Sequence, residues 1–132
     1  MIVDTGPLVL LLTEKHDTRY ETCLSVFEAF RGNLVTTLPC LTEVMYFLGG
    51  WHHQEQLWSW ISDGSVQIYD LTPNDLARME ELMGKYENVP MAFADASLAA
   101  LAEASSSNRV FTLDSDFTIY RFRESYSFEI IP

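Results

Sequence analysis

The hydrophobic residues of this chain follow two patterns, one typical of helices and one typical of strands. Between Asp17 and Phe30 the apolar side chains recur every three or four positions, which puts them on one face of a helix that stops near Gly32. Residues 34–37 and 65–71 are instead short runs rich in apolar and β-branched side chains. These patterns alternate along the sequence and predict helices and strands in turn.

Start and stop signals divide the rest of the chain. Pro7, Pro39 and Pro73 stand where proline favours the first turn of a helix, and Thr72 can cap the third of these helices. We expect strands at residues 1–4, 34–37, 65–71, 109–113 and 127–131, helices at residues 7–12, 17–30, 39–48, 52–62, 73–85 and 93–104, and a turn or short helix at 114–117. In the helix at 52–62 we expect Leu57, Trp58 and Ile61 to face inward.

Strands that alternate with helices favour parallel crossover connections. We therefore predict an α/β fold, a three-layer α/β/α sandwich with a mostly parallel central sheet. A length of 132 residues with 48% hydrophobic content suits one domain over residues 1–132. In open sheets of this kind ligands bind beyond the carboxyl ends of the strands, so polar residues at those positions are the candidates for function.

The net charge of the chain limits which ligands it can bind. The formal net charge is −11, from 19 acidic and 8 basic residues, which counts against indiscriminate binding of nucleic acids. It does not exclude a nuclease, because a divalent-metal site needs concentrated carboxylates and the metal then supplies local positive charge. What matters is whether the acids are scattered or gathered.

Other features of the composition point to an intracellular protein. The apolar stretch at residues 8–12 is far shorter than the roughly 20 residues needed to span a bilayer, so we expect a cytoplasmic protein without a membrane segment. Cys23 and Cys40 lie in apolar helical segments without the spacing of a zinc site, which predicts buried free thiols. His52 and His53 could form a metal pair, but adjacent helix positions face different ways, so the sequence favours solvated surface residues.

Four acids stand at positions where an α/β fold gathers its functional residues. Asp4 ends the first expected strand, and Asp114 follows the strand at 109–113. Glu43 lies on an otherwise apolar helical face, and Asp95 lies near the start of an alanine-rich helix. Taken alone, each acid has a simpler explanation as a cap or a helix-dipole partner. Together they predict a shared carboxylate site.

Gathered carboxylates repel one another by about 1 to 4 kcal/mol per close pair, so a fold tolerates them chiefly when a cation is bound. Oxygen ligands without imidazole or thiolate suit a hard ion, which makes Mg²⁺ or Mn²⁺ the expected cofactor. Water activated at such an ion hydrolyses phosphodiesters, so metal-assisted hydrolysis is the reaction that this pattern favours.

In their order and spacing, the segments around these acids resemble the motifs of the PIN domain, and specifically of the VapC-type toxins of bacterial and archaeal toxin–antitoxin pairs. The resemblance covers nearly the whole chain and rests on Ile2-Val3-Asp4-Thr5-Gly6-Pro7-Leu8, Thr42-Glu43-Val44, Asp95-Ala96-Ser97-Leu98-Ala99-Ala100-Leu101-Ala102 and Thr112-Leu113-Asp114-Ser115-Asp116-Phe117.

The resemblance implies an endoribonuclease that depends on Mg²⁺ or Mn²⁺, is often a homodimer, and is held inactive by a cognate antitoxin whose C-terminal segment occupies the active-site groove. It implies these roles: Asp4, Glu43, Asp95 and Asp114 as catalytic acids, Asp4, Asp95, Asp114 and Asp116 as metal ligands, and Thr5 and Thr112 as supporting hydroxyls. Asp116 could equally be a turn residue that caps the segment from Phe117 onward. Arg109, with Arg121 and Arg123, is the expected contact for RNA phosphates, although exposed arginines more often serve solubility.

Two other readings compete with the nuclease. A Mg²⁺-dependent phosphohydrolase would use Asp4 as nucleophile and needs a second acid two residues later, where this chain has Gly6. A non-catalytic PIN-like module would bind partners through its Trp and Met side chains, which more simply belong to the core or to a dimer surface. These are Trp51, Trp58, Trp60, Met45, Met79, Met83 and Met91.

Overall fold

The computed structural model describes all of residues 1–132 and has a five-stranded parallel sheet in the order β3-β2-β1-β4-β7. The strands are β1 (Ile2–Val3), β2 (Leu34–Thr37), β3 (Val66–Tyr69), β4 (Arg109–Phe111), β5 (Arg121–Phe122), β6 (Tyr126–Ser127) and β7 (Glu129–Ile131). The helices are α1 (Thr5–Thr13), α2 (Tyr20–Phe30), α3 (Leu38–Leu48), α4 (Trp51–Ser62), α5 (Pro73–Lys85), α6 (Phe93–Ala104) and the short 3₁₀ helix η1 (Ser115–Thr118).

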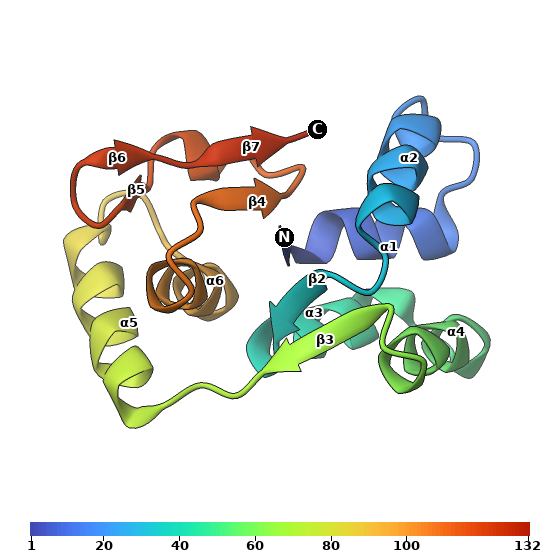
Figure 1. The fold of residues 1–132 in the computed structure, drawn as a ribbon, viewed down its shortest axis with the longest axis horizontal. Helices are drawn as coiled ribbons and strands as arrows, with labels where there is room; N and C mark the ends of the chain where they lie inside the picture. Colours follow the sequence, from blue (N-terminus) through green and yellow to red (C-terminus); the bar gives the residue numbers. More distant parts are fainter.

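Helices cover both faces of the sheet, which confirms the predicted α/β/α sandwich. In Figure 1, α5 and α6 lie on one side of the strands, and α1, α2 and α4 lie on the other side. Successive residues of β1 point to opposite faces, so Ile2 joins the hydrophobic cluster with α5 and α6, whereas Val3 joins the cluster with α1, α2 and α4. Full burial of a side chain of this size contributes roughly 1.5 to 3 kcal/mol.

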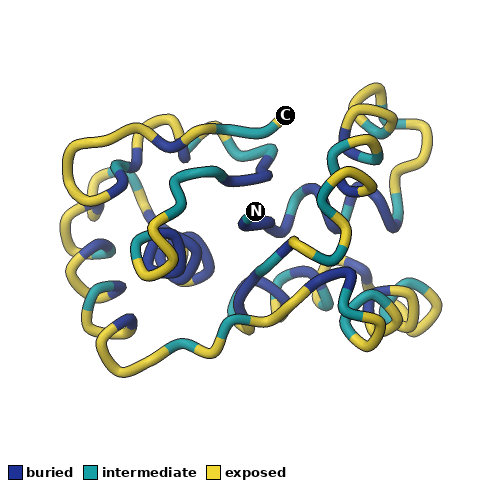
Figure 2. Tube along the Cα trace, viewed as in Figure 1, coloured by how far each residue is buried: buried dark blue, intermediate teal, exposed yellow.

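Helix α6 lies deepest in the molecule. Its residues from Ala94 to Ala102 are all buried, and Figure 2 shows it as a dark blue coil. Its many alanines let the helix approach the sheet and its neighbours closely, because a methyl group adds little bulk. A short hydrogen bond of 2.6 Å between the hydroxyls of Thr37 and Ser97 ties α6 to the start of α3. The N-terminal half of α6 is thereby fixed against β2 and α3.

The start of the chain differs in detail from the expectation. Helix α1 begins at Thr5 instead of Pro7, because Asp4 is its N-cap and its carboxylate accepts a hydrogen bond from the Thr5 amide. Helix α2 begins at Tyr20 instead of Asp17, since the Asp17 carboxylate accepts from the Arg19 amide and forms a local turn. In both places a short acidic side chain sets the boundary.

The C-terminal segment holds a hairpin that the sequence pattern did not predict. The expected strand at 127–131 is divided into β6 and β7, and β6 pairs antiparallel with β5. Ion pairs attach the hairpin to α5: Arg78 and Lys85 both contact Glu124, at 2.8 and 2.6 Å. Strands of two residues carry too little periodicity to be recognised in a sequence.

Helix α4 presents a different side chain to the core from the one expected. Trp58 is 50% exposed, whereas Leu57 is fully buried and Trp60 packs on Phe27 with ring centroids 4.5 Å apart. Positions three and four after Leu57 share its helical face, and the next position is turned about 100° away. Expecting Trp58 in the core was therefore an error of helical phase.

Two further expectations concern the thiols and the membrane. Both Cys23 and Cys40 are free and buried, as predicted, and burial raises the pKa of the Cys40 thiol to about 12. None of the helices has both the length and the hydrophobicity needed to cross a lipid bilayer.

Candidate metal centre

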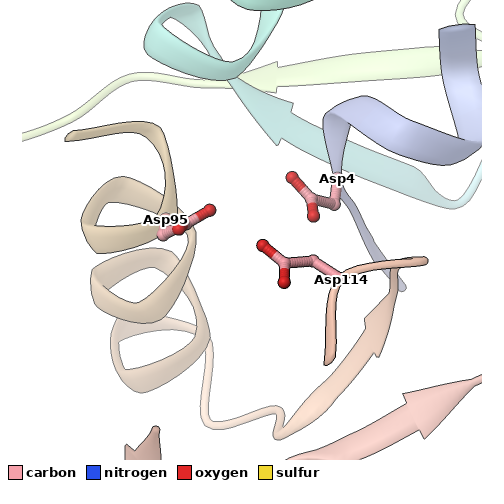
Figure 3. A group of neighbouring side chains, drawn as sticks. All are labelled: Asp4, Asp95 and Asp114. Carbon is pink, nitrogen blue, oxygen red and sulfur yellow. The ribbon is translucent and has the colours of Figure 1, made fainter. Parts of the chain in front are cut away.

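Three carboxylates converge where β1, β4 and α6 meet. Asp4 directly follows β1, Asp114 lies just beyond β4 as the N-cap of η1, and Asp95 lies in the first turn of α6. Each offers an oxygen atom, and these atoms lie within 4.8 Å of one another. Figure 3 shows the side chains of Asp4 and Asp114 directed toward Asp95. Because β1 pairs with β4 in parallel, Asp4 and Asp114 lie together at the carboxyl ends of these strands although they are far apart in the sequence.

Hydrogen bonds hold two of the three carboxylates in place. Oδ1 of Asp4 accepts from the Thr5 amide at 2.7 Å, and Oδ2 accepts from the Thr112 hydroxyl at 2.6 Å. The same hydroxyl accepts from the amide of Asp114 at 2.9 Å, so Thr112 bridges the two segments that carry these acids. Oδ1 of Asp114 accepts from the Asp116 amide at 2.9 Å.

A fourth acid borders the same pocket. Glu43 projects from α3, and its Oε2 accepts a hydrogen bond of 3.1 Å from the hydroxyl of Thr5. It lies outside the group of three oxygens but lines the same pocket, whose volume is 250 Å³. The lining residues are Asp4, Thr5, Gly6, Glu43, Asp95, Leu113 and Asp114. The pocket thus combines four acids with no basic side chain.

Close packing of Gly6 against Leu113 brings α1 near the segment that carries Asp114. A Cβ atom at Gly6 would lie 3.4 Å from Cβ of Leu113, which is at the lower limit of ordinary contact. Any side chain larger than alanine would therefore have to push this segment away.

Burial, together with the neighbouring negative charges, raises the pKa of two of these acids. Burial raises the pKa of Asp95 to about 7, with further contributions from the charges of Asp4 and Asp114. Burial also raises the pKa of Asp4, although its two hydrogen bonds act in the opposite direction. Tyr120 donates a long hydrogen bond of 3.4 Å to Asp95, which compensates little. Carboxylate oxygens without a cationic neighbour fit a hard divalent ion, and Mg²⁺ and Mn²⁺ match this donor set.

The structure brings some of the predicted residues together and leaves others apart. Thr5 and Thr112 contact the acids, as expected. Asp116 is not one of the three converging acids and supports Asp114 through its backbone amide. Arg109 begins β4 and therefore lies at the end of the strand away from Asp114, where it pairs with Glu129 at 3.4 Å.

The other two arginines expected to contact RNA also form hydrogen bonds within the protein. Arg121 donates to the backbone carbonyls of residues 118–120, and Arg123 donates to a carbonyl of Glu103 and to Ser106. A basic residue that the sequence reasoning missed, Arg19, instead lines two pockets beside the acids. Nothing local in residues 14–19 predicts this, because the loop reaches the site only through the tertiary fold.

Comparisons with known proteins agree with this arrangement. A family model described as "PIN domain" matches residues 1–123. Among solved structures, VapC20 of Mycobacterium tuberculosis, a toxin that cleaves the sarcin–ricin loop, superposes with a TM-score of 0.80 at 19% identity, covering 95% of this chain and 98% of that one. A chain of VapBC2 from Rickettsia felis, solved with a DNA fragment from its promoter, has a TM-score of 0.69 at 18% identity, covering 99% and 98%. No curated protein sequence matches significantly.

Proposed function

Since this chain belongs to the PIN domain family, we propose that it is an endoribonuclease dependent on a divalent metal ion and the toxin of a type II toxin–antitoxin pair. The observation that carries the proposal is the convergence of Asp4, Asp95 and Asp114, with oxygen atoms within 4.8 Å, in a pocket without a basic residue. Such a group is costly without a cation and serves hydrolysis of phosphodiesters with one.

We assign a separate role to each acid and hydroxyl of the pocket. Asp4, Asp95 and Asp114 would hold Mg²⁺ or Mn²⁺ through their oxygens, and Thr112 keeps the first and third at a fixed separation. The bound ion would supply positive charge to the scissile phosphate and make water more acidic. Glu43 lies outside the converging group but lines the same pocket, and in this proposal it would accept a proton from an attacking water. The Thr5 hydroxyl orients Glu43 for this role.

The proposal also covers the protein's partners. A solved VapBC2 complex shares this fold, so we propose a cognate antitoxin that covers the acidic pocket, together with a homodimer of a single-domain chain. Helices α3 and α4 carry exposed apolar side chains suited to such contacts, namely Leu38, Tyr46, Phe47, Trp51 and Trp58.

Removal of the metal tests the proposed function directly. Purified protein incubated with total RNA in Mg²⁺ or Mn²⁺ should produce discrete fragments, and an excess of chelator should stop the cleavage because the carboxylates then have no cation to hold. Addition of Mn²⁺ beyond the chelator should restore it. Cleavage that continues unchanged in chelator would rule out a metal-dependent nuclease.

Glu43 can be separated from the metal ligands by a conservative change. We expect Glu43→Gln to lower the rate of RNA cleavage on the order of 10²-fold, because the amide cannot accept a proton. The affinity for Mn²⁺ should stay within about threefold of wild type, since Glu43 lies outside the converging group. Calorimetric titration with Mn²⁺ and a cleavage time course measure the two quantities. A parallel loss of both would make Glu43 a metal ligand instead.

A further inference from the structure

A second pocket opens beside the acidic one. It has a volume of 400 Å³ and is lined by Thr18, Arg19, Thr22, Thr112, Leu113, Asp114, Ser115, Thr118, Ile130 and Pro132. Leu113 and Asp114 line both pockets, so the two pockets adjoin. A linear polymer bound at the acids can therefore extend directly into the second pocket. Its walls come from the start of α2, from η1 and from the end of β7. Hydroxyl groups and a guanidinium predominate among its polar groups.

Arg19 is the only basic residue that lines the pockets near the acids. The chain has 8 lysines and arginines, and none but Arg19 lines any of the pockets near the acids. Arg31, Arg78, Lys85 and Arg109 form ion pairs away from these pockets, whereas the ion pair of Arg19 with Asp17, at 2.9 Å, lies beside the acids. In a protein with a net charge of −11, a polyanion that approaches the metal site therefore meets one positive side chain beside it.

The side chain of Arg19 is held in place yet still able to bind. Its Nε and Nη2 donate to the two oxygens of Asp17 at 3.0 and 2.9 Å, a two-point contact that fixes the plane of the guanidinium. Its Nη1 has no protein acceptor, and the side chain is 56% exposed. Asp17 also accepts from the amide of Arg19, which fixes the loop itself.

We propose that this pocket binds a backbone phosphate of the RNA next to the scissile one, with Arg19 as the positioning residue that receives it; this inference rests on the proposed function. A guanidinium donates to phosphate oxygens through several N–H groups, and Asp17 prepares its orientation in advance. The hydroxyls of Thr18, Thr22 and Ser115 provide further donors for phosphate or ribose oxygens. Arg19 takes no part in bond cleavage.

Binding of RNA tests this subsite apart from catalysis. The probe is a labelled single-stranded RNA of mixed sequence, titrated in Ca²⁺ at times when the RNA stays intact. We expect Arg19→Ala to raise the Kd on the order of 10-fold, because a charge-assisted hydrogen bond is lost. The slope of log K against log salt should fall by about 0.7, the value for one phosphate contact on a single strand. Arg19→Lys should recover part of both.

Arg31→Ala is the matched control, since it removes the same charge at the other end of α2, roughly 18 Å away by the rise of the helix. Affinity for Mn²⁺ should be unchanged in both variants. The subsite is refuted if Arg19→Ala leaves the Kd and the salt slope at wild-type values, if Arg31→Ala weakens binding equally, or if the wild type binds no RNA. RNA binding that depends on Arg19 without cleavage in Mg²⁺ or Mn²⁺ would refute the nuclease and leave Arg19 as a contact for an RNA phosphate.

Discussion

Asp4→Asn is expected to lower RNA cleavage by at least about 10³-fold and to abolish tight binding of Mn²⁺. Asp4 is the acid that links the site together: it accepts from the hydroxyl of Thr112 and lies in the group with Asp95 and Asp114. Asparagine has the same shape, so the fold should persist. Its amide, however, has one acceptor oxygen in place of two and carries no charge for a cation.

The loss is measured by the initial rate of cleavage and by titration with Mn²⁺, with circular dichroism as the check on folding. Asp70→Asn is the matched control, because Asp70 is exposed, follows β3 and lines none of the pockets near the acids. We expect its rate to stay near that of the wild type. If Asp4→Asn retained both the rate and the affinity for Mn²⁺, the three carboxylates would be structural and the proposed function would fail.

In chelator, Asp95→Asn is expected to make the folded protein more stable at pH 8 than the wild type. The pKa of Asp95 is about 7 in the folded protein, against an ordinary value of 3.8. Between these values the folded state keeps a proton that the unfolded state has lost, so the free energy of unfolding falls as pH rises. The penalty is absent below pH 3.8 and complete above about pH 7.

With allowance for solvent screening, the penalty is on the order of 1 to 3 kcal/mol, which corresponds to a rise in Tm of roughly 5 °C or more when asparagine removes it. Thermal melts of both proteins from pH 4 to pH 8 measure the difference, in which acids remote from the site cancel and Asp4 and Asp114 also gain from the loss of the neighbouring charge. Added Mn²⁺ should reverse the order, because it stabilises only the protein that binds it. A wild type that is more stable than Asp95→Asn in chelator at pH 8 would contradict this account.

The four acids were predictable because each carries a local signal. Asp4 and Asp114 follow apolar strand segments, and Glu43 and Asp95 interrupt apolar helical faces, so the sequence pattern alone marks them. The rules for parallel sheets then place strand ends and helix starts at one edge. The structure adds that Glu43 stands apart from the other three.

What the sequence did not reveal depends on contacts between distant segments. Arg19 reaches the site through the path of the loop before α2, whereas Arg109 is turned away because it begins its strand instead of ending it. The strand order β3-β2-β1-β4-β7 also depends on pairing that no local pattern encodes. The acids that converge were thus easier to predict than the basic residue that lies beside them.

The hydrogen bond between Thr112 and Asp4 joins residues that are 108 positions apart, and this separation has a consequence for synthesis in the cell. β1 is translated long before β4, and it cannot pair with β4 until residues 109–111 have left the ribosome. Closure of so long a loop is also among the slower steps of folding. A nascent chain therefore cannot bring Asp4, Asp95 and Asp114 together until β4 and the segment that follows it have been translated.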